Sequence, residues 1–368
     1  METMTKRPVT VIVGGGLALA GLLFWLGPTP LPPAAPPVPR GGTVTGPRPP
    51  PTPGLIPASL NRAPPPAPHP TNVFTRLMNG EGAELRPDQV QGYLLDNHRD
   101  AASLLAAFRA THDQALLKEA EEKYPNDPRV AMEAAWRSAS PEDRRKWLDT
   151  FKRAAPDNAV PNLLSAASYF RDGQPEEAVQ EVMAAASKPI EDYSRDFGQS
   201  AEEAYLAAGY SAVDAKGLAT TTLLLPQMAE YKAVAVGLAD MANAYRQAGD
   251  QASAQASLQW ALNLGQRLDD PSSLTEIQSL VGIAVQRIAL NGMDPGAAPG
   301  DGGQTVQSQL DALTQERQTF KTLNQQWDVI QPTVSDQDAL NYFNRRWLFG
   351  EQAAAQWIVA KYGPQTGR

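Results

Sequence analysis

The sequence predicts an all-α protein built from paired helices, and three observations support that prediction. Apolar residues recur at helical spacing from Pro87 onward, and no stretch alternates polar and apolar residues in the way a half-buried strand would. Signals that stop and restart helices are frequent. Prolines at positions 125, 156 and 189 recur at intervals of 31 and 33 residues, a period typical of stacked helix pairs.

Several helix boundaries are marked by residues with a known capping role. Ser140-Pro141 combines a capping hydroxyl with a proline in the first turn. Gly173 and Gly249 each end one helical run shortly before the next begins, because glycine accepts the left-handed backbone of a tight turn. Ser335 opens a sequence that resembles a capping box. These signals predict separate helices joined by short turns.

Two segments share one spacing of aromatic and small residues. The shared positions are Tyr169, Gly173, Ala178 and Ala185 in the first segment, and Tyr245, Gly249, Ala254, Leu258 and Ala261 in the second. This pattern resembles the tetratricopeptide repeat (TPR) family, as does the junction Ala155-Pro156-Asp157-Asn158-Ala159. The resemblance implies a TPR-like solenoid of helical hairpins over residues 72–291. The segments lie 76 residues apart, which is not a whole number of 34-residue repeats, so we expect the solenoid to be degenerate.

Residues 9–26 read as a membrane anchor. They contain eighteen uncharged and mostly apolar residues. As a helix they would rise about 27 Å, close to the roughly 30 Å thickness of the hydrocarbon layer. Lys6 and Arg7 precede the segment and Trp25 lies near its far end. Residues 1–8 are therefore expected in the cytoplasm and the body outside it, in the periplasm if the cell is Gram-negative.

Two alternatives concern the same segment. Cleavage after Ala18-Leu19-Ala20 would make it a secretory signal peptide instead of an anchor. Gly14 and Ala18 have the spacing of small residues that lets two transmembrane helices approach closely, so the anchor could form a homodimer. Both the anchored and the cleaved form deliver the body across the membrane.

Residues 27–71 form a proline-rich spacer that we expect to be disordered. Eighteen of the 33 prolines lie between Pro28 and Pro70. Proline removes an amide donor and blocks helices and central strands, so the segment should sample extended polyproline II. It could serve as a passive stalk. It could instead bind a proline-recognising domain, or contact the cell wall through its arginines.

Charge and composition exclude several classes of function. Residues 1–70 carry five basic groups and one acid, for a net charge of +4, and the whole chain is at −8, so residues 71–368 carry −12. An acidic body repels phosphate backbones, which argues against a nucleic-acid partner. There is no cysteine, which excludes disulfides and cysteine-ligated metals.

The C-terminal part is predicted to be a separate helical region, residues 304–368, after a Gly- and Pro-rich loop at residues 292–303. An apolar stripe predicts one long helix over residues 304–330, and Gly350 divides two further helices at residues 336–349 and 351–362. This region is rich in aromatic side chains. We expect them either to cap the long helix or to contact a partner, with Tyr342, Phe343, Trp347 and Trp357 as the candidates.

No sequence motif for catalysis is found. His98 and His112 lack the spacing of metal ligands, and no nucleophile elbow or phosphate-binding loop occurs. We therefore expect no enzyme activity, no metal and no cofactor. The sequence favours a membrane-anchored scaffold that binds a protein or peptide outside the cytoplasm. The alternative is a structural cell-envelope or peptidoglycan-contacting spacer without a specific peptide ligand.

Overall fold

The computed structural model describes residues 71–363, apart from residues 83, 222, 224, 272 and 300–302. All regular elements in this part of the chain are helices and none is a strand, which confirms the all-α prediction. In chain order they are α2 (Val73–Met78), α3 (Pro87–Asp96), α4 (Ala101–Thr111), α5 (Gln114–Lys123), α6 (Pro128–Arg137), α7 (Pro141–Ala154), α8 (Val160–Arg171), α9 (Pro175–Ala185), α10 (Ser194–Ala207), α11 (Ala212–Thr221), α12 (Gln227–Gln247), α13 (Gln251–Leu268), α14 (Glu276–Asn291), α15 (Val306–Ile330), the short 3₁₀ helix η1 (Gln331–Thr333), α16 (Asp336–Phe349) and α17 (Glu351–Tyr362).

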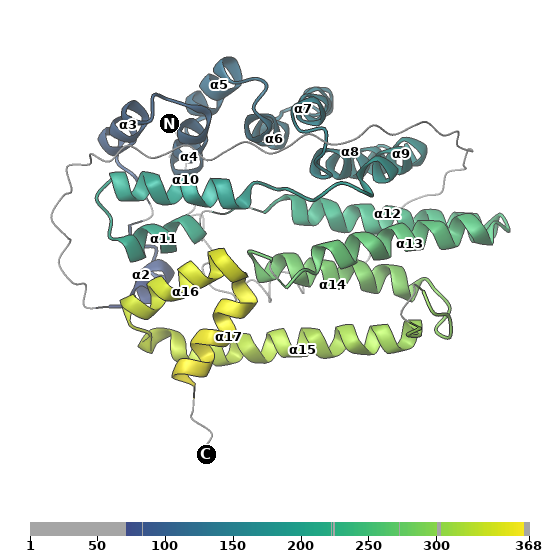
Figure 1. The fold of residues 1–368 in the computed structure, drawn as a ribbon. Helices are drawn as coiled ribbons and strands as arrows, with labels where there is room; N and C mark the ends of the chain where they lie inside the picture. The colour runs from purple at the N-terminus through teal and green to yellow at the C-terminus, as the bar shows by residue number, and fades with distance from the viewer. Residues whose placement is uncertain are drawn as a thin grey trace, which may run out of the picture.

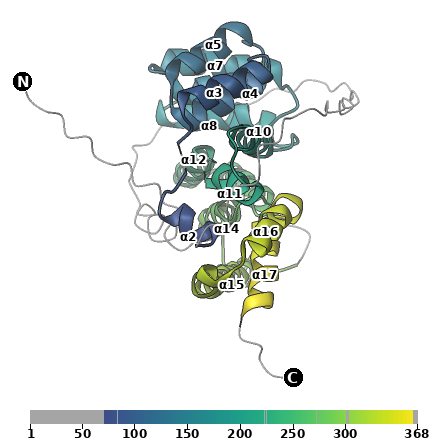
Figure 2. The same ribbon diagram turned by 90° about the vertical axis from the view of Figure 1, so that its left-hand side faces the viewer.

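The helices are arranged in three layers (Figure 1). Helices α3 to α9 form the upper layer, which we call the hairpin row, and most of them are seen end-on. Helices α10 to α14 lie beneath the hairpin row and run across it, and α15, α16, α17 and α2 form the lower layer. The same order from top to bottom is visible after a quarter turn (Figure 2). The first described helix, α2, thus lies beside α11 and α16 and away from its chain neighbour α3 in the hairpin row.

Within the hairpin row, inner and outer helices alternate. Helix α4 packs on α5, α6 on α7 and α8 on α9, and each hairpin contacts the next. The inner helices α4, α6 and α8 are buried nearly all round, with unbroken buried runs at residues 103–108, 130–135 and 160–167. The outer helices α5, α7 and α9 each bury only two or three residues along one side. A helix that is buried all round has partners on both sides, so the inner helices are covered from below as well.

The regular order of hairpins ends at α9, because the chain then turns beneath the row. Asn158, which precedes α8, holds the connecting segment: its side-chain amide donates to the Glu191 carbonyl oxygen at 2.7 Å, and its oxygen accepts from the Glu191 amide at 3.1 Å. The Ala159 amide also donates to the Pro189 carbonyl oxygen at 2.8 Å. Helix α10 consequently starts under the row and contacts α3 and α4, and α12 contacts α8 and α9.

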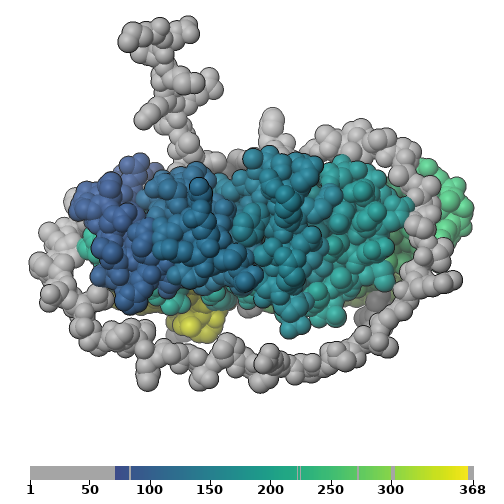
Figure 3. All heavy atoms as spheres, turned by 90° about the horizontal axis from the view of Figure 1, so that it is seen from above, coloured from purple at the N-terminus to yellow at the C-terminus, as the bar shows by residue number. Residues whose placement is uncertain are grey.

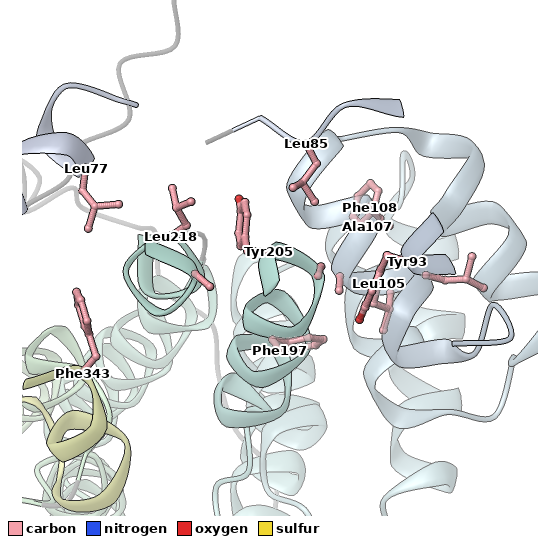
Figure 4. Close-up of a cluster of buried hydrophobic side chains, with 14 of the residues drawn as sticks. Leu77, Leu85, Tyr93, Leu105, Ala107, Phe108, Phe197, Tyr205, Leu218 and Phe343 are labelled. Atoms are coloured by element: carbon pink, nitrogen blue, oxygen red, sulfur yellow. The ribbon is translucent and has the colours of Figure 1, made fainter. Parts of the chain in front are cut away.

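Two hydrophobic cores hold the layers together. The first core joins the start of the hairpin row to α10, α11, the end of α15, α16, α17 and α2. The second core joins α8 and α9 to α12, α13, α14 and the first part of α15. Figure 4 shows part of the first core, with Phe197 of α10 on the side of the row and Tyr205 between α10 and Leu218 of α11. Both cores include residues from either side of the loop at residues 292–303, so neither ends at that loop.

Most predicted helix boundaries agree with the structure. Ser140 and Ser335 cap α7 and α16 by accepting hydrogen bonds from the amides three residues further on. The left-handed turns at Gly173 and Gly249 have φ of +69° and +83°. The two C-terminal helices have the predicted limits, and α15 starts two residues later than the predicted long helix. Local signals therefore located the elements, although they carried no information on the layers.

Two glycines in helix interiors give a test of the packing between layers. An atom at the Cβ position of Gly237 in α12 would lie 2.5 Å from the Phe170 ring, whereas nothing lies within 4 Å of that position at exposed Gly92 in α3. We expect Gly92→Ala to raise the free energy of unfolding by about 0.5–1 kcal/mol, since alanine restricts the unfolded chain. Gly237→Ala should lower it by about 1–3 kcal/mol through overpacking. Urea denaturation followed by circular dichroism measures both, and a stabilised Gly237→Ala protein would contradict the described packing of α12 on α8.

Candidate functional site

The first set of repeat positions lies in the hairpin formed by α8 and α9. Gly173 makes the turn between the helices, where the Gln174 amide donates to the Tyr169 carbonyl oxygen at 2.9 Å. Ala178 and Ala185 are completely or almost completely buried on the side of α9 that meets α8. Tyr169 is half-buried, and the Arg145 guanidinium of α7 lies 5.0 Å from the centre of its ring. These residues thus shape a helix–helix contact.

The second set lies in the hairpin formed by α12 and α13. Gly249 makes the turn, and the Asp250 amide donates to the Tyr245 carbonyl oxygen at 2.8 Å. The remaining positions, Ala254, Leu258 and Ala261, are buried in α13. Helix α12 packs directly on α8, so the structure brings the two sets, 76 residues apart in sequence, into the second core.

The inner side of the hairpin row is the surface on which the resemblance places a peptide ligand. In the structure, α10 and α12 of the same chain cover it. Phe197 of α10 inserts against the row, and the Arg109 guanidinium of α4 lies 3.5 Å from the centre of its ring. Arg109 in turn pairs with Glu133 of α6 at 2.6 Å, with side-chain exposures of only 8% and 3%. A peptide could reach this inner side only by displacing α10.

Polar contacts extend along this interface. The Tyr93 hydroxyl of α3 donates to the Ser200 carbonyl oxygen of α10 at 3.2 Å. Glu230 of α12 accepts from Arg144 of α7 at 3.0 Å and from Arg171 at the end of α8 at 2.5 Å. Burial lowers the pKa of the Arg109 guanidinium, which Glu133 opposes. A buried pair of charges is costly to separate, so it favours a fixed position of α4 relative to α6.

These contacts had no signal in the sequence. Arg109 and Glu133 are 24 residues apart and Arg144 and Glu230 are 86 apart, so neither pair has a helical spacing that local reasoning could detect. Gly198 in α10 does signal a close approach, since a glycine in a helix interior suggests that another element lies against it, but the element there is α16 and not the row.

Two of the four candidate aromatic contacts are internal. Tyr342 and Phe343 have exposures of 6% and 2% and form one cluster with Trp327 of α15 and Phe74 of α2. The Trp327 and Tyr342 rings stack at 4.9 Å, and Phe74 meets Trp327 edge-on at 4.8 Å. The cluster therefore corresponds to packing against the long helix, the first of the two expected roles. These two rings are not presented to a partner on the surface.

The other two candidates are half-buried. The Trp347 ring fills the space beside Gly198, whose Cβ position lies 2.0 Å from it. The cations of Arg345 and Lys361 lie 4.6 Å and 5.7 Å from the centre of the Trp357 ring. The most exposed apolar side chains beside them are Leu348 at 71% and Phe349 at 54%, which the sequence did not single out as contacts.

A buried carboxyl group lies where α14, α15, α16 and α17 meet. Glu276, at the start of α14, accepts a hydrogen bond from the Asn324 side-chain amide at 2.6 Å. Its own backbone amide donates to Glu351 at 2.6 Å, and Arg346 pairs with Glu351 at 3.3 Å. Burial, together with the charge of Glu351, raises the pKa of Glu276 to about 7.

Among the residues described, no three His, Asp or Glu side chains are grouped so that they could hold a metal ion. His98 and His112 both have left-handed backbone, with φ of 53° and 58°, and His112 ends α4. Their positions are those of turn residues.

The predictions for the N-terminus concern residues outside the described part of the chain. The tail at residues 1–8, the anchor at residues 9–26 and the spacer up to residue 70 all lie there. Within residues 71–363, as far as they are described, none of the helices has the length and apolar character needed to cross a bilayer.

Comparison with known proteins does not assign the chain to a family. No family model, no curated protein sequence and no solved structure matches it. Its function must therefore be inferred from its own sequence and geometry.

Glu276 predicts a specific dependence of stability on pH. The folded protein holds the Glu276 proton up to a pKa of about 7, whereas an ordinary glutamate releases it near 4.5. The stabilisation from this group is therefore complete below pH 4.5 and is lost as the pH rises to 7, by about 3 kcal/mol. Glu276→Gln, which keeps an oxygen for Asn324, should remove this part of the decline. Urea denaturation of both proteins from pH 4 to 8 measures it, and parallel curves would show that Glu276 titrates normally.

Proposed function

We propose that this protein is a membrane-anchored scaffold that binds another protein outside the cytoplasm, and that the hairpin row is a degenerate TPR-like solenoid. The alternating burial of its helices carries the proposal. Inner helices α4, α6 and α8 are covered on both sides, and outer helices α5, α7 and α9 remain open to solvent. Their open sides form one elongated face, which we call the outer face (Figure 3).

The position of the outer face supports a docking role. Because α10 and α12 cover the inner side, the surface that TPR-like proteins offer to a peptide is taken by the chain itself. The outer face lies on the opposite side of the molecule from α2, where the N-terminal segment enters the fold (Figure 1). A proline-rich spacer of about forty residues would let this face reach a partner well away from the membrane.

The chemistry of the outer face favours a protein with a mixed charged surface. On α7, exposed Glu142, Lys146, Asp149 and Arg153 follow one another at helical spacing. Charges of both signs at such an interface give specificity and orientation more than affinity. We therefore expect a reversible partner whose binding weakens with salt.

Membrane anchoring is tested with two substitutions in residues 9–26. Leu19→Arg and Leu22→Arg together place two charges near the centre of the proposed helix, at a cost of about 2.5–3.5 kcal/mol each. We expect the wild-type chain in the carbonate-washed membrane fraction and the double variant outside it. Leu31→Arg and Val38→Arg in the spacer are the matched control and should stay in the membrane fraction. A wild-type chain that is soluble and has the mass left by cleavage after Ala20 would show that the segment is a signal peptide.

Docking through the outer face is tested by reversing charge on either side of the molecule. Lys146→Glu with Arg153→Glu changes the outer face, and Arg317→Glu with Lys321→Glu makes the same change on exposed positions of α15. Full-length proteins are used to capture partners from detergent-solubilised membranes. We expect the wild type and the α15 variant to capture one protein in equal amounts. The α7 variant should capture at least about tenfold less of it. Equal capture by both variants would refute docking on this face.

A further inference from the structure

Helix α2 is docked far from its chain neighbour and on three separate elements. It packs on α11, η1 and α16 in the lower layer, whereas α3, the next helix, belongs to the hairpin row. Figure 4 shows Leu77 of α2 directed toward Leu218 of α11 and Phe343 of α16. The segment at residues 79–86 connects the two layers, and Gly80 and Gly82 within it have φ of +70° and +77°.

Apolar contacts hold one side of α2. Val73, Phe74 and Leu77 have exposures of 0%, 5% and 6%. Phe74 lies in the aromatic cluster with Trp327, Tyr342 and Phe343. Gly217 of α11 leaves room for the helix, since an atom at its Cβ position would lie 2.8 Å from Leu77 and 3.2 Å from Val73. The site is therefore shaped to fit this segment.

Polar contacts fix the other side of α2. Arg76 is only 4% exposed and pairs with Asp214 of α11 at 2.6 Å and with Asp336 of α16 at 3.1 Å. The Asn72 side-chain amide donates to the Gln331 and Val334 carbonyl oxygens, both at 2.8 Å. The Val73 amide donates to Asp336 at 2.7 Å. Each of the three supporting elements is thus held by charge or hydrogen bonds as well as by packing.

The short length of α2 and its place in the chain make it separable from the rest of the fold. A helix of six residues is not stable alone in water, where about 12–15 residues are needed, so α2 is helical only while docked. The second core contains no residue before Ala159 and does not depend on α2. The N-terminal segment enters the fold at Thr71, so any pull on that segment acts on α2 before any other described helix.

We propose that α2 is a latch: it opens as a unit, while the rest of the fold stays intact, and uncovers the aromatic cluster and the carboxylate of Asp214. Its release by tension rests on the proposed membrane anchor. The opening itself is a property of the chain and needs no membrane.

Native-state hydrogen exchange on the full-length protein in detergent tests the opening. We expect amides of residues 73–78 to exchange through an opening that leaves α8 and α12 protected and depends little on denaturant. Phe74→Ala should increase that opening at least about a hundredfold, and Phe349→Ala, which changes an exposed ring, should not. Exchange of α2 only together with α12 in the wild-type protein would overturn the proposal.

A disulfide gives a second test, in which the reduced and oxidised forms of one variant are compared with each other. The chain has no cysteine, so Val73→Cys with Gly217→Cys introduces one defined pair. The 3.2 Å between Val73 Cγ2 and the Cβ position of residue 217 suits a disulfide, which places one Cβ about 3 Å from the other sulfur. Oxidation should raise the protection of α2 to that of α12, and reduction should reverse it. Unchanged exchange after complete oxidation would refute the latch.

Pulling on single molecules separates the latch from the anchor. With handles at the N-terminus and on a cysteine at exposed position 118, we expect a first step, shorter than the about 50 Å contour of residues 72–86, before the hairpin row unfolds. Phe74→Ala should lower the force of that step. Unfolding without such a step overturns the latch wherever the protein resides. If the first step is seen but the chain fractionates as soluble, the latch is supported and the proposed membrane anchor is refuted.

Discussion

The start of the hairpin row is joined to the layer beneath it at a buried charge, where Phe197 inserts against the pair of Arg109 and Glu133. The pair joins α4 to α6 at 2.6 Å, and the guanidinium carbon of Arg109 lies 3.5 Å from the centre of the Phe197 ring. Two charges buried to this extent are stable only as a pair, and the aromatic ring adds a cation–π contact to the guanidinium. If α10 left the row, the ion pair and the apolar side of α4 would be exposed together.

The covered inner side distinguishes the hairpin row from a stack of helical repeats with a free inner surface. In a stack of hairpins that ends in solvent, the inner side remains free for a ligand. Here the connector held by Asn158 turns the chain back, and α10 fills that side. The hairpins therefore provide a rigid support whose outward surface is their remaining free side. This is the reason for placing the proposed docking surface on α5, α7 and α9.

The sequence predicted the elements of the fold better than their assembly. Serine caps, left-handed glycines and apolar stripes act over three or four residues, so the limits of α7, α16 and α17 could be predicted from them. The second layer depends on pairs such as Arg144 with Glu230, which no local pattern links. The sequence showed that α16 is rich in aromatic residues, but it could not show what they pack against, because their neighbour Phe74 lies more than 260 residues earlier.

Both ends of the described chain meet at the start of α16. Asn72 binds the carbonyl oxygen of Val334, and the Tyr362 hydroxyl accepts from the Ser335 amide at 3.1 Å. Because Val73 and Asp336 are 263 positions apart, α2 cannot find its place until nearly the whole protein has been synthesised. At about 5–20 residues per second, this delay amounts to roughly 10–50 s. During that time α2, which is only six residues long, has no surface to dock on and cannot be stably helical.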